Sequence, residues 1–577
     1  MPDDERAPFG VSLTKRYTSP VAESVLYDTV KVRGHSEIQL VDYMGGPDMI
    51  ERVATAGHGR DIFPEEPSQE SFLRYLVANS ILAPFRSVQL KFSIQAPIST
   101  ALAFVYDPRA SVNEYSGRYS VMLDSARLPS RAEIASHFPA GVPEVDKRVA
   151  EIESLLIEGR RDAAERYKGL LETDLARELA RSGLGPNNDT RFVWKMDLVS
   201  LASFVKRQRN VTHPTSHTRE CVDTIDEIAR YVGGAAWDAL IEYAAPDFPL
   251  NLTMPNDDFV VDGLLAPSPW EVSSTRRVCA PGLEEALFVS RQVLDHGLFQ
   301  PVDYMGDDSA PAQAARTSYG QGTKQLQEDT KLIHSLARDA HTTPLEMAEL
   351  AVESRVPFFS DPRQAGRHRT LAHHGFMGYF PLGSLFYFPS DEQFKYQDRK
   401  NRQGRGADMD ETDRTRSKEL LRATLEGQVR RAQVLRALGA PEEYIRDMKG
   451  VGFYTKTWRI GDAHNLTKFL GLRTDAHAQF EVRAFAHEVD HALALQIPIT
   501  HEAAHTYMID GMRLSTRDIH HFAASGLLLP SVNPSDVSAY VPLGLTLPID
   551  KNDLSKGVKL TREGEALRTK VQRLRNP

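Results

Sequence analysis

The segment Val41-Asp42-Tyr43-Met44-Gly45 occurs twice in this chain, the second time as Val302-Asp303-Tyr304-Met305-Gly306. Other matches follow in the same order, and Val193-Trp194-Lys195 corresponds to Thr457-Trp458-Arg459. The copies are separated by roughly 260 residues, which is far longer than the repeat of a solenoid protein. The sequence therefore predicts a duplicated domain rather than a stacked array of short units.

The duplication divides the 577 residues into two repeats and three further segments. We expect an N-terminal extension at 1–35, repeat 1 at 36–250, a linker at 251–296, repeat 2 at 297–515 and a C-terminal extension at 516–577. Each repeat has a β-like stretch (87–94 and 349–356) and a long amphipathic stretch (145–171 and 417–438) with apolar residues three or four positions apart. These patterns predict a mixed α/β fold of the α+β kind.

Composition excludes several classes of protein. The chain has 41% hydrophobic and 25% charged residues, which is typical of a folded globular protein, and no apolar run approaches the roughly 20 residues that span a membrane. Its first ten residues are acidic and lack the apolar region of a secretory signal. Two cysteines are too few for a disulfide framework, so we expect a cytoplasmic protein. A net charge of −9 argues against general binding of nucleic acid.

Two segments at matching places in the repeats carry the polar chemistry. In repeat 2, Arg367-His368-Arg369 puts three cationic or titratable groups into one turn. Arginine offers a planar fork of donors to a phosphate or to the polar edge of a ring. In repeat 1, residues 113–120 supply an amide, a carboxylate, hydroxyl groups, a glycine and Arg118. These residue types suit the sugar and phosphate of a nucleotide.

The two segments resemble the two halves of the signature R-H-R-x-A-S-x-N-E-x-S-x-R of the flavin-dependent thymidylate synthases. Repeat 1 has the second half in residues 110–118, and its Arg-His-Arg is replaced by Tyr106-Asp107-Pro108. Repeat 2 keeps the first half, and the second has become residues 374–379. Further stretches of repeat 2 also resemble this family, namely 305–308, 314–320, 341–344, 401–405 and 465–473.

The resemblance implies two tandem domains, each with a curved, mainly antiparallel sheet and long helices. It also implies methylation of dUMP to dTMP, with FAD as the cofactor and NADPH and methylenetetrahydrofolate as co-substrates. Enzymes of the family are homotetramers whose sites are built across subunits. Two copies of this duplicated chain are therefore expected to form a homodimer that imitates a tetramer.

The resemblance divides the site residues between the repeats. For the nucleotide it implies Gln364 and Arg367 of repeat 2, and Glu114, Ser116, Gly117, Arg118 and Arg181 of repeat 1, with Arg473 favouring ionisation of the uracil ring. For FAD it implies Ser318, His341, Thr343, Arg367, His368, Arg369, Asp462, His464 and Lys468 of repeat 2, with Asn113 and Glu114 of repeat 1. The opposite pairing has lost most of these residues, since Tyr106, Gln208 and Tyr379 stand where Arg367, Arg473 and Arg118 stand in the first. Only Arg446, which matches Arg181, survives there. We therefore expect one composite site per chain.

Other interpretations stay open. The chain could be a catalytically impaired flavin- or nucleotide-binding scaffold, or could methylate another pyrimidine nucleotide.

A zinc metalloprotease is a more remote alternative. Residues 487–491 and 501–505 both match H-E-x-x-H, which binds zinc together with a third ligand such as His520 or His521. The family resemblance explains both copies as ordinary helices, the second with Thr500 as its N-cap. We therefore expect no metal.

Overall fold

A computed structural model of the chain describes residues 11–55, 68–115, 121–136, 138–173, 177–181, 184–212, 216–243, 270–317, 326–360, 377–397, 405–439, 452–475, 478–511, 546–549 and 558–560. The chain forms two compact units, Met1–Ile509 and Asp510–Pro577. In the second unit, strands β15 (Thr546–Pro548) and β16 (Val558–Leu560) pair in antiparallel fashion. Both repeats belong to the first unit, which carries all of the features considered below.

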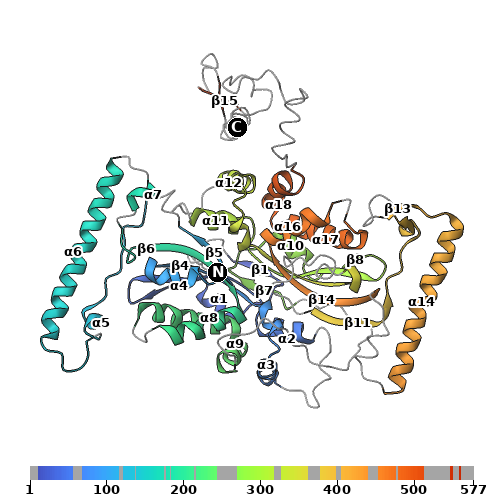
Figure 1. Cartoon of the computed structure of the whole chain (residues 1–577), viewed down its shortest axis with the longest axis horizontal. Coiled ribbons are helices and arrows are strands. Elements are labelled where there is room, and N and C mark those ends of the chain that lie inside the picture. Colours follow the sequence, from blue (N-terminus) through green and yellow to red (C-terminus); the bar gives the residue numbers. More distant parts are fainter. Residues whose placement is uncertain are drawn as a thin grey trace. The chain divides into compact units, whose positions relative to one another are not determined.

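The elements follow the two repeats along the chain (Figure 1). The elements up to Tyr243 are β1 (Ser12–Thr14), α1 (Pro20–Val25), β2 (Thr29–Val32), β3 (Ser36–Met44), α2 (Pro47–Thr55), α3 (Gln69–Ala78), η1 (Ala83–Ser87), β4 (Gln89–Pro97), α4 (Ile98–Val105), β5 (Ser111–Glu114), α5 (Arg131–Ser136), α6 (Val145–Glu172), α7 (Arg177–Ala180), β6 (Asp189–Asp197), α8 (Leu198–Val211) and α9 (His217–Tyr243). The elements from Ser273 to Ile509 are β7 (Ser273–Thr275), α10 (Pro281–Ala286), β8 (Arg291–Val293), β9 (Gly297–Met305), α11 (Ser309–Thr317), α12 (Leu326–Arg338), η3 (Thr343–Met347), β10 (Glu349–Pro357), η4 (Phe358–Ser360), β11 (Met377–Phe386), η6 (Asp391–Gln393), β12 (Lys395–Gln397), β13 (Arg405–Asp408), α14 (Glu411–Ala437), β14 (Phe453–Asp462), α16 (Ala463–Arg473), α17 (Phe480–Gln496), α18 (Pro498–Ala504) and the π-helical turn η7 (His505–Ile509).

Each repeat contains one five-stranded sheet in which every neighbouring pair is antiparallel. The strand orders are β2-β3-β4-β6-β5 and β8-β9-β10-β14-β11, so the second sheet repeats the topology of the first. The predicted mixed fold with mainly antiparallel sheets is confirmed. The long helices expected near 145–171 and 417–438 are α6 and α14.

The duplicated segment that ends β3 and β9 has the same irregularity in both copies. The pairing of β3 with β4 skips Val41, and the pairing of β9 with β10 skips Val302. One extra residue bends the strand and increases its twist. The glycine that follows then adopts a positive φ, +69° at Gly45 and +74° at Gly306. A side chain there would also crowd a backbone oxygen, because an added Cβ would lie 2.9 Å from Ser87 O or 3.0 Å from Met347 O.

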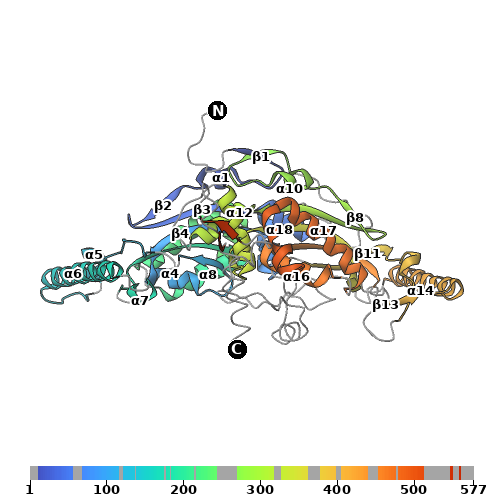
Figure 2. The same cartoon turned by 90° about the horizontal axis from the view of Figure 1, so that it is seen from above.

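The structural equivalence begins before the boundaries expected for the repeats. Strands β1 and β7 pair with each other, and β1 is labelled at the top of Figure 2. Each strand is followed by an arginine that crosses to the other repeat. The guanidinium of Arg16 lies 4.1 Å from the ring centre of Tyr304 and donates to Tyr304 O at 3.2 Å. Arg277 lies 4.2 Å from the ring centre of Tyr43 and donates to Tyr43 O at 2.8 Å. Parts of the expected extension and linker are thus ordered and hold the two repeats together.

A buried core also joins the repeats directly. It contains Met44, Met49, Val53 and Ala83 of repeat 1 with Val302, Met305, Ala351, Trp458 and Ile460 of repeat 2. Within it, Asp303 Oδ2 accepts a hydrogen bond from Gly45 N at 3.1 Å, and Asp303 Oδ1 accepts from Tyr304 N at 2.8 Å. Each repeat therefore supplies part of the other's buried surface.

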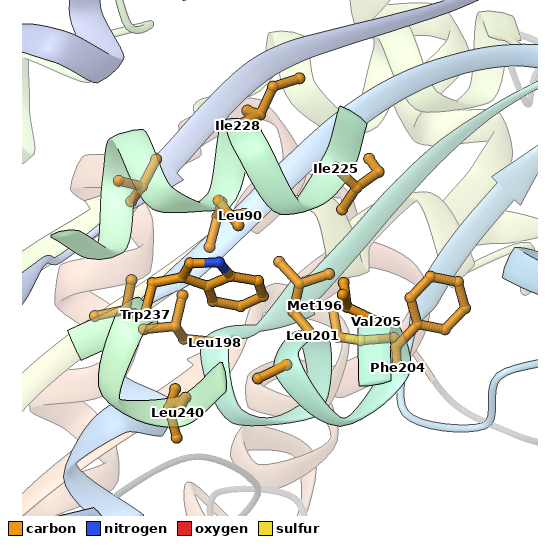
Figure 3. Close-up of a cluster of buried hydrophobic side chains, with 14 of the residues drawn as sticks. Leu90, Met196, Leu198, Leu201, Phe204, Val205, Ile225, Ile228, Trp237 and Leu240 are labelled. Carbon is orange, nitrogen blue, oxygen red and sulfur yellow. The ribbon is translucent and has the colours of Figure 1, made fainter. Parts of the chain in front are cut away.

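The other face of each sheet is covered by helices. In repeat 1, α8 and α9 pack their apolar residues on the sheet around Leu90, Met196 and Trp237 (Figure 3). Register shows that the two Trp residues matched in the sequence are not equivalent. Trp194 pairs with Phe92, whereas Arg459 rather than Trp458 pairs with the corresponding Val352. Because neighbouring strand residues face opposite sides, Trp194 packs in the core of repeat 1 and Trp458 in the core between the repeats.

Among the described residues, no helix is long and apolar enough to cross a membrane.

The conformation of the two duplicated glycines yields a test. We expect Gly45→Ala and Gly306→Ala each to lower the stability of the fold by about 1–3 kcal/mol, because alanine is strained at a positive φ and its Cβ meets the backbone. Gly159→Ala is the matched control, since nothing lies within 4 Å of an added Cβ there and alanine favours a helix. Thermal unfolding measures all three. Equal melting temperatures for Gly45→Ala and Gly159→Ala would show that a side chain at position 45 causes no strain.

Asp303 gives a second test. Burial raises its pKa to about 6, against the opposing effect of Arg277 and Arg16, whereas an unfolded aspartate titrates near ~3.9. The stabilisation due to its neutral form is complete below about pH 4 and is lost as the pH rises through about 6, up to roughly 3 kcal/mol. The melting-temperature advantage of the parent over Asp303→Asn should therefore shrink between pH 4.5 and pH 7. As a control, Asp162→Asn on exposed α6 should change the melting temperature by a small amount that does not depend on pH. The prediction is refuted if the melting-temperature difference between the parent and Asp303→Asn grows as the pH rises.

Candidate functional site

Two segments predicted to share a site meet where β5 of repeat 1 contacts η3 of repeat 2. Asn113 Nδ2 donates to Thr343 O at 3.2 Å, and Thr343 Oγ1 donates to Asn113 Oδ1 at 3.3 Å. β5 pairs with β6, and η3 begins directly before β10, so both sheets position this contact. We call the group Asn113, Lys195, Thr343, Glu346 and Glu349 the β5–η3 junction.

A buried ion pair crosses the same junction. Lys195 Nζ lies 3.1 Å from Glu349 Oε2, and the two side chains are 5% and 1% exposed. Burial lowers the pKa of Lys195, but the carboxylates of Glu349 and Asp462 outweigh it and leave that pKa raised. Burial and the Asp462 carboxylate raise the pKa of Glu346, which is hydrogen-bonded to Ser111. The junction thus concentrates charged groups beside the start of α16.

Helix α16 carries four residues that the sequence assigns to the site. Asp462 is its N-cap, and the two Asp462 oxygens accept from Asn465 N at 2.9 Å and Asn465 Nδ2 at 2.8 Å. Asp197 caps α8 in the same way, accepting from Ser200 N at 3.0 Å. A carboxylate at this position therefore has a structural reason in both repeats.

Two other side chains of α16 each have a buried nitrogen. His464 Nδ1 and Arg473 Nε are buried without a hydrogen-bond partner in the described part of the chain. Burial lowers the pKa of both groups, and at His464 the nearby Lys468 adds to this effect. An unpaired buried donor costs on the order of 1–3 kcal/mol, so a bound polar molecule that pairs it would be favoured.

The remaining predicted residues have varied surroundings. Glu114 accepts from Thr190 Oγ1 at 2.9 Å, and Arg181 is exposed just after α7. His341 and Lys468 are exposed. The predicted residues Ser116, Gly117, Arg118, Ser318, Gln364, Arg367, His368 and Arg369 lie outside the described residues.

Sequence reasoning missed three charged residues of the junction, namely Lys195, Glu346 and Glu349. Lys195 and Glu349 lie in strands whose other residues are mostly buried, and a charge in such a strand requires a partner. The sequence therefore indicated that each charge needs a partner. It did not indicate which residue the partner is, because Lys195 and Glu349 are 154 positions apart.

Comparison with known proteins gives the family. The model of the family described as "Thymidylate synthase complementing protein" matches residues 39–232 and again residues 301–499. The chain belongs to this family. Both matches fall within the repeats, so the family's domain is present twice.

Individual proteins are also similar to this chain. The chain is 38% identical over 257 residues to the flavin-dependent thymidylate synthase of Ruegeria pomeroyi, covering 42% of this chain and 82% of that protein. It is 37% identical over 265 residues to the enzyme of the same name from Rickettsia typhi, covering 43% and 88%. Among solved structures, the UMP/dUMP methylase PolB of Streptomyces cacaoi is 25% identical over 37% of this chain and 96% of its own, with a TM-score of 0.34.

The contact across the junction can be tested by a double-mutant cycle. Asn113→Ala removes both hydrogen bonds to Thr343, whereas Thr343→Val removes only the one donated by its hydroxyl. We expect each change to lower stability by about 0.5–3 kcal/mol and the two effects to overlap by about 0.5–1.5 kcal/mol in the double variant, because they share one contact. Thermal unfolding of the four proteins measures this overlap. Strictly additive effects would mean that the two side chains do not interact.

Proposed function

We propose that the chain methylates dUMP to dTMP, using FAD, NADPH and methylenetetrahydrofolate, at one composite site that the two repeats of a single chain form together. The observation that carries this proposal is the hydrogen-bonded contact between Asn113 and Thr343. It joins the repeat that keeps the Asn-Glu-x-Ser-x-Arg half of the signature to the repeat that keeps the Arg-His-Arg half. Membership of the family supports the reaction class.

In the described part of the chain, the buried nitrogens His464 Nδ1 and Arg473 Nε have no hydrogen-bond partner, which suits a bound polar ligand. We propose that Thr343, Arg367, His368, Arg369, His464 and Lys468 hold FAD, together with Asn113 and Glu114 across the junction and with Ser318 and His341. The bound flavin supplies the redox chemistry, while the protein orients the rings and sets the local charge. Asp462 holds the helix that presents His464, because its own oxygens are occupied by Asn465.

The nucleotide has its own proposed residues. Ser116, Gly117, Arg118 and Arg181 of repeat 1, with Gln364 and Arg367 of repeat 2, bind its phosphate and sugar, since arginine forks suit phosphate oxygens. Arg473 faces the uracil ring and stabilises the negative charge that develops there, which a fixed cation in a partly buried place does strongly.

The cysteines do not offer a thiolate nucleophile. Burial raises the pKa of Cys221 to about 12, and burial also raises the pKa of Cys279. Neither belongs to the β5–η3 junction, and these are the chain's two cysteines. The proposed reaction accordingly uses no cysteine.

The composite site predicts which arginines matter. We expect Arg118→Ala and Arg367→Ala each to lower kcat/KM for dUMP by about 100-fold or more, since each removes a charged contact from the same site. Tyr379→Ala and Tyr106→Ala change the corresponding positions of the opposite pairing and should leave kcat/KM within about twofold. Formation of dTMP with NADPH and methylenetetrahydrofolate measures all four. Comparable losses in the tyrosine variants would refute a single composite site.

A mixing experiment tests whether the site lies within one chain. If Arg118 and Arg367 act in the same chain, mixed dimers of Arg118→Ala and Arg367→Ala have no intact site and stay inactive. If the halves came from different chains, such dimers would regain one intact site and activity would return. Assaying the parent with UMP and dUMP decides the nucleotide. A folded parent that binds FAD but methylates neither would favour the flavin-binding scaffold.

A further inference from the structure

Three metal-ligating side chains meet in repeat 2 away from the β5–η3 junction. They are Asp490 of α17, His501 of α18 and His505 of the turn η7, and one ligand atom from each lies within 4.8 Å of the other two. His501 Nε2 and His505 Nε2 both lie 2.8 Å from the same oxygen, Asp490 Oδ1. The two imidazole rings are 4.5 Å apart between centres.

The backbone explains this convergence. α18 begins at Pro498, so Thr500 lies inside the helix and is not the N-cap that the sequence suggested. Asp308 fixes this start by accepting from Ile499 N at 2.9 Å and Thr500 N at 2.7 Å. His501 and His505 are four residues apart and therefore lie on one face of the continuing helix. α18 follows α17 after the single residue Ile497, which brings that face against Asp490.

We propose that Asp490, His501 and His505 bind a divalent transition metal of the zinc class. Two imidazole nitrogens and one carboxylate oxygen are a ligand set that zinc accepts, with a fourth position left to water. The side chains of Asp490, His501 and His505 are 23%, 21% and 26% exposed, so solvent reaches the site. Zinc bonds of about 2.0–2.1 Å place neighbouring ligand atoms slightly over 3 Å apart. The present 2.8 Å spacing between each Nε2 and Asp490 Oδ1 needs to open by only a few tenths of an ångström. Each histidine would bind the metal through Nε2 as the neutral ring, with its proton on Nδ1.

This ligand set is not the one that the sequence suggested. The third ligand expected for the second H-E-x-x-H was His520 or His521, which lie outside the described residues. Asp490 comes instead from within the first copy of the motif. The histidines of that first copy, His487 and His491, are both exposed, and its Glu488 pairs with Arg291. The metal would clamp α18 to α17, which is a structural role separate from the proposed methylation.

The test uses the full-length chain without an affinity tag, freed of metal by a chelator and then titrated with Zn²⁺ or Co²⁺. We expect one metal per chain, a visible Co²⁺ spectrum of nitrogen and oxygen coordination, a higher melting temperature with Zn²⁺, and no displacement by excess Mg²⁺. Asp490→Asn keeps a hydrogen-bonding side chain but loses the carboxylate, and His501→Ala removes one imidazole. Both should bind Zn²⁺ about 100-fold more weakly or worse and lose the melting-temperature rise.

His487→Ala and His491→Ala are the matched controls and should bind like the parent. Melting temperatures of the metal-free variants show that each one folds. The inference fails if the parent binds no stoichiometric metal, because the three groups would then form only a hydrogen-bond network. It also fails if the folded Asp490→Asn protein binds as tightly as the parent, or if the controls weaken binding as much as the ligand changes do.

Discussion

The arrangement of the two repeats depends on the hydrogen bond that Gly45 N donates to the buried side chain of Asp303. It connects the two copies of one five-residue segment, and each copy ends a strand of a different sheet. Two arginines also connect the repeats near this bond. Arg16 packs on Tyr304 of repeat 2, and Arg277 packs on Tyr43 of repeat 1. Because these groups are buried, the two repeats cannot separate without exposing unpaired polar atoms and apolar surface to water. The repeats therefore behave as one folded unit.

This constraint determines where the candidate site can form. Once the sheets are held together, β5 of repeat 1 contacts η3 of repeat 2 and Lys195 reaches Glu349. Asn113 and Thr343 are 230 residues apart along the chain, yet the fold places them in hydrogen-bonding contact. The contact thus links one repeat to the other at residues that the sequence assigns to the site.

Much of the fold was predictable because it follows local patterns. Apolar spacing predicted α6 and α14, and the repeated segment predicted two equivalent sheets. Other features were not predictable because sequence similarity does not show which residues become partners in the fold. The stretches before the two repeats contain β1 and β7, which pair with each other. Trp194 and Trp458 align in the sequence, but the register of their strands differs by one residue, so they lie on opposite faces of their sheets. In the same way, nothing near Asp490 in the sequence indicated that His501 and His505 would both meet it.

Covalent duplication has a consequence that a symmetric oligomer cannot share. In a homo-oligomer every substitution appears in all equivalent sites at once, so no site can be kept while another is lost. Here equivalent positions of the two repeats are free to differ. Lys195 and Glu349 form a buried ion pair, whereas the positions of equivalent register in the opposite repeats hold Ile460 and Gln89. A buried charge needs its partner, so Lys195 and Glu349 must be retained together, whereas an apolar residue and a neutral amide have no such requirement. The buried charges of the β5–η3 junction therefore depend on both repeats.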